Sequence, residues 1–455
     1  MTLLDQPAPT ARALDHHHRA ITVGLLALVT MFAFEAVAVS LAMPAVAREL
    51  DGTTLYPIAV VGLLTAAIVG MVVGGIWSDA RGPALPITAG GAVFVVGLLL
   101  SGFASSMEVF VLGRLLQGLG CGAALTAMYV VVGDAYPQAL RPRVFSLFAT
   151  AWVLPSIAGP FVAGALVDLS GWRSVFLVVA AFAAVSVAGV RVAVGRRLAV
   201  RTAPLEWSRR PWFATVAAVA VVLLHLAGHA HSLPAVALLL TGLALLGYAV
   251  PPLLPRGTLR ASAGLPAVVA ARAVFGAAFV CVEMFLPLVL QDESGLSPTV
   301  TGLVMMVGAL GWTAGSAYSG RHGRSDTFGS LLWAGALTLL GGAVALTVLV
   351  PIDHLAVSAA ALATVGFTVM AVGMGLATPL MSTLSLDLAA RGRQGESGAA
   401  IQMSDALGQS IAAGVVGAVF ARWFLLDPDT SYLAGFGLAV LLGVTALWTV
   451  RRARV

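Results

Sequence analysis

The stretch VFVLGRLLQGLGCG, residues 109–122, places one arginine in the middle of an otherwise apolar segment. A charge in hydrocarbon is costly, so it persists only where it faces protein, a partner charge or water. Arg114, Gln117, Gly118 and Cys121 follow the i, i+3, i+4, i+7 spacing of one helix face. That face combines a fixed positive charge, an amide and bare backbone, which indicates the lining of a polar pathway through a membrane.

The composition of the whole chain also indicates a membrane protein. Of 455 residues, 59% are hydrophobic and 10% are charged, and the mean hydropathy is +0.98, whereas soluble proteins carry about 25% charged residues. All 25 basic residues are arginine. The pI near 9.8 would suit a nucleic-acid partner, but the positions of the arginines argue against one.

Fourteen apolar segments have the length that a transmembrane helix needs, which is roughly 20 residues for a hydrocarbon core of about 30 Å. The shorter alternating segments of a membrane β-barrel do not occur in the sequence. We therefore expect an all-α membrane protein with 14 transmembrane helices and both termini on one side. The segments are 21–43, 55–77, 84–104, 107–132, 144–167, 174–194, 212–230, 234–253, 265–290, 299–320, 328–350, 355–384, 397–421 and 431–450.

The arginines support this alternation. With the N-terminus inside, 20 of the 25 fall in inner loops and tails, 3 fall outside, and Arg114 and Arg272 fall within segments. Cytoplasmic loops of membrane proteins are rich in basic residues. We therefore expect both termini to be cytoplasmic in a bacterial inner membrane, and this bias explains the high pI without nucleic acid.

The segments divide as six, two and six. We expect two six-helix bundles of the same topology with an inserted two-helix hairpin, an arrangement in which carriers bind substrate near the midplane between parallel repeats. The expected parts are a tail at 1–20, the first bundle at 21–194, a cytoplasmic linker at 195–211, the helix pair at 212–253, the second bundle at 265–450 and a tail at 451–455.

The loops are too short for a catalytic domain, and a Gly-x-x-x-x-Gly-Lys-Ser/Thr phosphate loop is impossible without lysine. We therefore expect no enzyme, no cofactor and no metal. Uphill transport would then draw its energy from an ion gradient. We also expect the protein to act as a monomer in the lipid bilayer.

Three acidic residues lie well inside apolar segments: Glu35, Glu283 and Asp405. Burial in a low-dielectric cavity favours the protonated form of a carboxyl, so such a group can take a proton from one side and release it on the other. The alternative is a buried acid that pairs with arginine for packing alone. We predict proton coupling at these three acids with Arg114 as modulator, whereas Arg272 is expected to extend to the membrane interface.

Aromatic and amide side chains lie near the predicted acids. A pocket lined by adaptable apolar groups binds bulky amphiphiles, although helix packing explains any single aromatic residue equally well. The predicted substrate-binding residues are Glu35, Phe34, Gln117, Trp152, Phe279, Glu283 and Gln402.

Several of these segments resemble the major facilitator superfamily, most closely its 14-helix drug/proton antiporter branch. Residues 114–120, RLLQGLG, are similar to the Arg-x-x-Gln-Gly motif of the fourth helix, which is associated with proton coupling. Residues 35–44, EAVAVSLAMP, resemble the first-helix pattern, and residues 171–176, GWRSVF, resemble the opening of the sixth helix. The resemblance implies that Arg114 lies near Glu35.

Two motifs depart from the family pattern. In the Gly-x-x-x-Asp-Arg-x-Gly-Arg loop, Gly75, Asp79 and Gly82 match, but Ala80 replaces the first arginine; we expect Arg81 to substitute for it by bridging to Asp134. The fifth-helix antiporter motif is only partly kept at residues 155–164, where Gly159, Pro160 and Gly164 match and the other motif glycines are replaced. The resemblance implies gating residues Gly75, Asp79, Arg81, Gly82, Asp134, Gly159 and Pro160.

The sequence thus predicts a secondary active exporter that exchanges protons for a hydrophobic or cationic small molecule, such as a drug, dye or secondary metabolite. One alternative is a proton-coupled importer or a dedicated exporter of a lipid, siderophore or amino acid. An alternative from another class is a membrane sensor or scaffold that transports nothing, but it leaves the charges within the segments unexplained.

Overall fold

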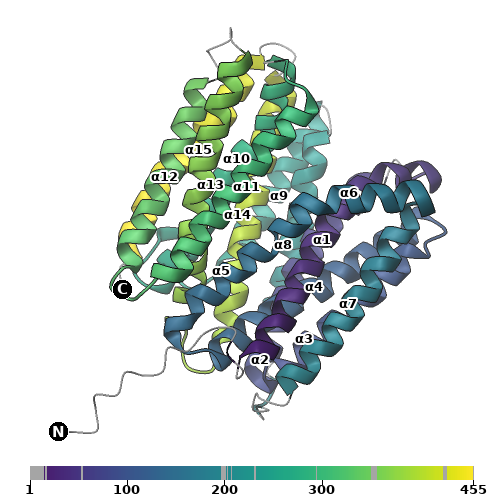
Figure 1. The fold of residues 1–455 in the computed structure, drawn as a ribbon, viewed down its shortest axis with the longest axis vertical. Helices are drawn as coiled ribbons and strands as arrows, with labels where there is room; N and C mark the ends of the chain where they lie inside the picture. Colours follow the sequence, from purple (N-terminus) through teal and green to yellow (C-terminus); the bar gives the residue numbers. More distant parts are fainter. Residues whose placement is uncertain are drawn as a thin grey trace.

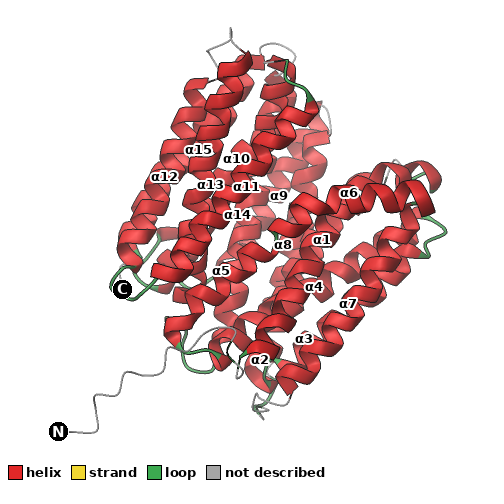
Figure 2. Ribbon diagram, viewed as in Figure 1, coloured by secondary structure: helices red, strands yellow, loops and turns green. Residues whose placement is uncertain are grey.

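The computed structural model describes residues 15, 18–52, 55–195, 201, 203–205, 208–229, 232–293, 295–349, 356–423 and 428–453. Within these ranges every regular element is a helix (Figures 1 and 2). The long helices are α1 (Arg19–Glu49), α2 (Tyr56–Arg81), α3 (Ala84–Gly102), α4 (Met107–Ala135), α5 (Arg141–Ala151), α6 (Val153–Ser170), α7 (Trp172–Gly195), α8 (Arg210–His229), α9 (Ser232–Leu253), α10 (Leu265–Leu288), α11 (Pro298–His322), α12 (Phe328–Leu349), α13 (Ala356–Asp387), α14 (Gln394–Trp423) and α15 (Pro428–Arg452).

Among the described residues, 12 helices are long and apolar enough to cross a membrane. The chain is therefore a multi-pass membrane protein. Residues 138–170, which form α5 and α6, would make one further span if the bent pair is taken as one, giving 13. The 30-residue helix α14 is not among the 12; it carries the polar side chains of Gln402, Asp405 and Gln409.

The helices form two groups with the same pattern of neighbours, α1 to α7 and α10 to α15 (Figure 1). In the first group α4 packs on α2 and α3, while α7 packs on α1 and α3. In the second group α13 packs on α11 and α12, while α15 packs on α10 and α12. This repetition is what parallel repeats produce. The domain boundaries drawn from the sequence remain predictions.

Glycines allow the central helix of each group to approach its neighbour closely. A Cβ atom at Gly118 of α4 would lie 2.2 Å from the carbonyl oxygen of Leu63 on α2. At the equivalent contact, a Cβ at Gly375 of α13 would lie 2.1 Å from the carbonyl oxygen of Trp312 on α11. In a membrane, where lipid tails are as apolar as leucine, such close backbone contact is a main source of helix association.

Helices α8 and α9 pack on each other, and α8 also packs on α2 of the first group and α14 of the second. Buried side chains of α8 and α9 belong to the same hydrophobic cluster as side chains of α2 and α14, among them Met71 and Met403. The helix α8 therefore lies at the junction of the two groups.

The motif at residues 171–176 fastens α1 to α7. Glu49, at the end of α1, accepts a hydrogen bond of 2.8 Å from Nε1 of Trp172 and forms an ion pair with Arg173. The hydrogen bonds from Arg173, which has the larger effect, and from Trp172 lower the pKa of Glu49. Phe176 is fully buried, with its ring edge-on to Phe110 at 5.3 Å.

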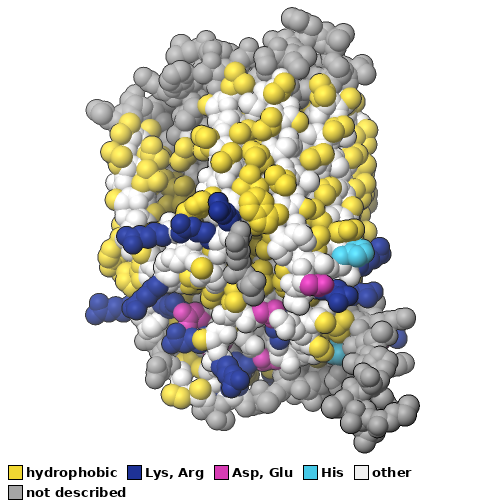
Figure 3. Space-filling view, turned by 90° about the vertical axis from the view of Figure 1, so that its left-hand side faces the viewer, with side chains coloured by type: hydrophobic (Ala, Val, Ile, Leu, Met, Phe, Trp, Pro, Cys, Tyr) yellow, Lys and Arg dark blue, Asp and Glu magenta, His cyan; other side chains and the backbone are white. Residues whose placement is uncertain are grey.

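We call the end at which α1 begins and α2 ends the arginine-rich end. Figure 3 shows arginine side chains gathered in the lower part of the molecule, below a broad apolar surface. Among the described residues, the hydrogen bonds and ion pairs that join the two groups lie toward this end, as between Arg141 and Asp387 and between Asp79 and the backbone of Gly395. The two groups are therefore fastened together at the arginine-rich end.

We predict that Gly118→Ala lowers the free energy of unfolding by about 1–3 kcal/mol, the usual cost of overpacking, because the new Cβ forces α4 away from α2. Gly189→Ala is the control, since nothing lies within 4 Å of a Cβ at this helical position; it should be neutral or stabilising by up to about 1 kcal/mol. Thermal unfolding in detergent measures both. Equal midpoints for the two variants would contradict the close contact.

Candidate functional site

The candidate site is centred on a buried ion pair between α1 and α4. Nη1 of Arg114 donates to Oε1 of Glu35, and the two residues are 6% and 1% exposed. Nε of Arg114 donates to the carbonyl oxygen of Ala59 on α2 at 3.2 Å. The guanidinium therefore connects three helices of the first group, and the proximity of Arg114 to Glu35 that the family resemblance implied is observed.

Gln117 extends this network to α3. Its Oε1 accepts from Nη1 of Arg114 at 2.7 Å, while its Nε2 donates to the carbonyl oxygen of Gly97 at 3.1 Å and to Oγ of Ser101 at 2.9 Å. Gln117 is fully buried. Both ends of its amide are thus engaged inside the bundle, so the side chain holds Arg114 in place in this conformation.

The chemistry of the pair is that of a proton-dependent contact. Arginine stays charged at any relevant pH, whereas a carboxyl group can take a proton. Protonation of Glu35 removes the attraction to Arg114, and breaking a buried ion pair changes stability by about 3–5 kcal/mol. A single proton can therefore alter how α1 packs against α4.

A second ion pair joins α10 to α14. Nη2 of Arg272 donates to Oδ2 of Asp405 at 2.8 Å, with side chains 13% and 18% exposed. The expectation that Arg272 extends to the interface is therefore wrong. Oδ1 of Asp405 and Nε2 of Gln402 are buried without a hydrogen bond in the part of the chain that the structure describes. The third predicted acid, Glu283, is exposed on α10 and joins none of the ion pairs among those residues.

The predicted aromatic residues do not form one cluster with the acids. Phe34 lies beside Glu35 on α1 and is partly buried. Phe279 packs edge-on to Trp312 at 5.1 Å in the second group. Trp152 is 45% exposed between α5 and α6. Their roles in substrate binding remain predictions.

Asp79 connects the end of α2 to the start of α14. Its carboxylate accepts from the backbone N–H groups of Gly395 at 2.7 Å and Glu396 at 2.9 Å, where the helix dipole favours a negative charge. A Cβ at Gly75 would lie 2.7 Å from the carbonyl oxygen of Gly395, so glycine allows this approach. Gly82 follows α2 with φ +83°, which favours glycine.

Asp134 has a different partner from the one we expected. The side chain of Arg81 is exposed, and Asp134 instead binds Arg201, whose Nη2 lies 2.9 Å from both carboxylate oxygens. The expectation of an Arg81–Asp134 bridge is therefore wrong. Arg201 belongs to the linker between α7 and α8, 67 residues along the chain from Asp134, and no motif in the sequence indicated it.

The sequence reasoning also missed a second connection at this end. Arg141, at the start of α5, pairs with Asp387 at the end of α13, and Nε2 of Gln138 donates to the same carboxylate at 2.8 Å. Nη2 of Arg141 donates to the carbonyl oxygen of Gly133 at 2.8 Å. The available signal was that both charged residues stand next to the ends of apolar segments on the same side.

The predicted gating residues Gly159 and Pro160 lie where residues 138–170 bend by 44°. Proline lacks the N–H donor of a helical hydrogen bond, and helices bend at such positions. A Cβ at Gly159 would lie 3.1 Å from Cγ1 of Val37 on α1. The bend therefore lies against the helix that carries Glu35.

Comparisons with known proteins agree on the family. The Major Facilitator Superfamily profile matches residues 23–413. A probable multidrug-efflux transporter of Mycobacterium tuberculosis is 25% identical over 412 residues, which are 83% of this chain and 82% of that protein. An MFS-type transporter of Penicillium citrinum, gkaD, is 27% identical over 172 residues, which are 38% of this chain but only 29% of that protein.

The fold is similar to that of solved structures. The human organic anion transporter MFSD10 (TETRAN) superposes with a TM-score of 0.64 at 13% sequence identity, covering 94% of this chain and 98% of that one. At this identity the likeness concerns the fold alone.

We predict that Glu35→Leu lowers the free energy of unfolding by about 3–5 kcal/mol, because it leaves the buried guanidinium of Arg114 without a counter-ion. Adding Arg114→Leu should recover most of the loss, since replacing both partners by apolar groups is often nearly neutral. Chemical denaturation in detergent measures the single and double variants. Losses that simply add would contradict a direct buried pair.

Proposed function

Because the chain belongs to the major facilitator superfamily, whose members are transporters and not enzymes, we propose that it is a secondary active exporter. It exchanges protons for hydrophobic or cationic small molecules by alternating access. The single observation that carries this proposal is the buried ion pair of Glu35 and Arg114. Burial of two charges costs stability, so a charged pair inside membrane helices indicates a functional role.

In the proposed cycle Glu35 holds the exchanged proton. With the proton bound, Arg114 loses its counter-ion and remains attached to Gln117 and to the backbone of α2. With the proton released, the ion pair forms and α1 is drawn to α4. A cationic substrate competes with the proton for the carboxylate, which gives exchange. Asp405, held by Arg272, is the second site at which a proton or a cation acts.

We propose 14 membrane spans, as in the drug/proton antiporter branch. The bent α5–α6 segment and the polar helix α14 then each count as one span, and α8 and α9 form a helix pair inserted between two six-helix bundles. The packing of α8 on both groups supports this arrangement. The excess of arginine supports a cytoplasmic location for both termini. We expect a monomer in a bacterial cell membrane.

The described conformation suits a carrier that faces outward. Its two groups are joined by hydrogen bonds and ion pairs toward the arginine-rich end, which we assign to the cytoplasm. The substrate class is supported by the relatives named as multidrug transporters, among them multidrug resistance protein 3 of Bacillus subtilis.

We predict that Glu35→Gln abolishes proton-driven efflux. Glutamine keeps an oxygen acceptor for Arg114 but cannot exchange a proton, so folding should be retained. The measurement is efflux of a cationic dye from whole cells of a host without its own pumps, with and without an uncoupler. The matched control is Glu108→Gln at the exposed start of α4, which should leave efflux unchanged. Undiminished efflux by Glu35→Gln at equal expression would refute the role of Glu35.

A further inference from the structure

The linker between α7 and α8 brings an arginine into the junction of the two helix groups. Nη2 of Arg201 binds both carboxylate oxygens of Asp134 at 2.9 Å and lies 3.5 Å from Oε1 of Gln394. Its Nη1 lies 4.0 Å from Oδ1 of Asp79. One linker residue thus contacts the ends of α2 and α4 and the first residue of α14.

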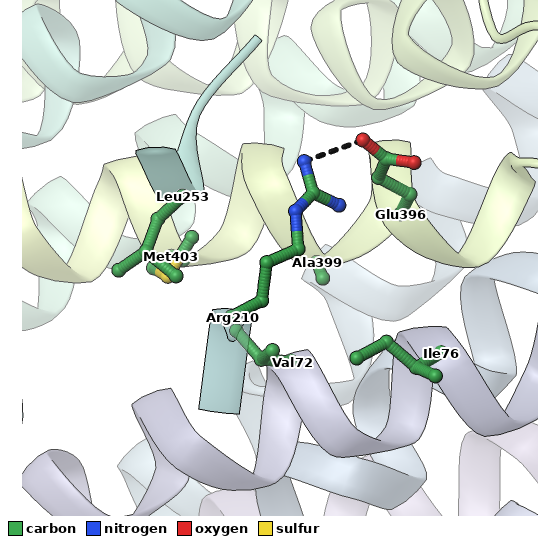
Figure 4. Close-up of a pocket in the computed structure, with 7 residues that line it drawn as sticks. All are labelled: Val72, Ile76, Arg210, Leu253, Glu396, Ala399 and Met403. Carbon is green, nitrogen blue, oxygen red and sulfur yellow. Dashed lines mark ion pairs between the residues drawn. The ribbon is translucent and has the colours of Figure 1, made fainter. Parts of the chain in front are cut away.

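A second arginine stands nine positions further along. Arg210, the first residue of α8, places Nη2 2.5 Å from Oε1 of Glu396 in the first turn of α14. Figure 4 shows this pair beside apolar side chains of α2, α9 and α14, among them Val72, Leu253 and Met403. The same turn of α14 also binds Asp79, which accepts from the backbone of Glu396.

The residue next to Asp79 explains why the positive charge near this carboxylate comes from the linker. Position 80 carries an alanine, which is buried and has no charge to offer. The neighbouring Arg81 is exposed. Arg201 is therefore the cation that the two carboxylates of Asp79 and Asp134 share, with Nη1 toward Asp79 and Nη2 on Asp134.

We propose that two described residues, Arg201 and Arg210, act together as a strap that keeps the arginine-rich end closed. Arg201 holds the ends of α2 and α4 together and reaches α14, while Arg210 ties α8 to the same turn of α14. Any motion that parts α14 from α2 must break the Arg210–Glu396 pair or carry α8 along. The helix pair α8–α9 is thereby coupled to the opening and closing of the arginine-rich end, which would be its role in the transport cycle. This reading of the strap as a gate rests on the proposed transport function.

The test measures the gate itself, independently of transport. Spin labels at Leu85, an exposed residue at the start of α3, and at Arg391, an exposed residue before α14, report the distance across the arginine-rich end by pulsed electron resonance. The background replaces the buried cysteines Cys121 and Cys281 by alanine.

We expect Arg201→Ala to move the ratio of closed to open populations about tenfold toward the longer distance, which corresponds to one lost charge-assisted hydrogen-bonded contact. Arg210→Ala should act in the same direction, and Arg201→Lys should retain most of the closed population. The matched control is Arg209→Ala, which removes an exposed linker arginine that joins none of the ion pairs among the described residues.

An unchanged distance distribution in Arg201→Ala would overturn the proposal, as would an equal shift in Arg209→Ala. A lower unfolding temperature without a change in distance would also overturn it, because it would assign Arg201 a purely structural role. The outcome is separable from the exporter assignment. If the parent protein shows no efflux but the distances respond as expected, the proposed role of Arg201 and Arg210 is supported and the proposed export function is refuted.

Discussion

The cost of placing charge in an apolar medium is the constraint on which the rest of this structure depends. Arg114 is tolerated because its guanidinium binds Glu35 on α1, the backbone of α2 and Gln117 on its own helix. Gln117 in turn binds the backbone of α3. These contacts require close helices, which the glycines of α2, α3 and α4 allow. Packing and electrostatics therefore depend on each other within the first helix group.

The same constraint operates at the arginine-rich end, with water nearby. There the charges need not be buried completely, and they join separate elements. Asp79, Asp134, Asp387 and Glu396 each bind a backbone or arginine donor from another helix or from the linker. The described conformation is thus held by polar contacts that can be exchanged, while each helix group is held by backbone contact that cannot.

The sequence predicted the helical class, the repeated arrangement and a buried Arg114, because hydropathy and arginine position record what lipid and water permit. It did not predict the partners of Arg201, Arg141 or Arg272. Those pairs join residues that are 67, 246 and 133 positions apart, and periodicity within one helix carries no information about such contacts. The expected partner of Asp134 was also wrong, because Arg81 stands next to the position where the family motif has its arginine, whereas the actual partner is Arg201.

Proton coupling at Glu35 is the central claim, and proton release on substrate binding tests it most directly. Purified protein in detergent with weak buffer and a pH indicator is titrated with a cationic substrate. The account predicts that the parent protein releases protons as the substrate binds and that Glu35→Gln, folded to the same extent, releases markedly fewer. Equal release from the two proteins would contradict it.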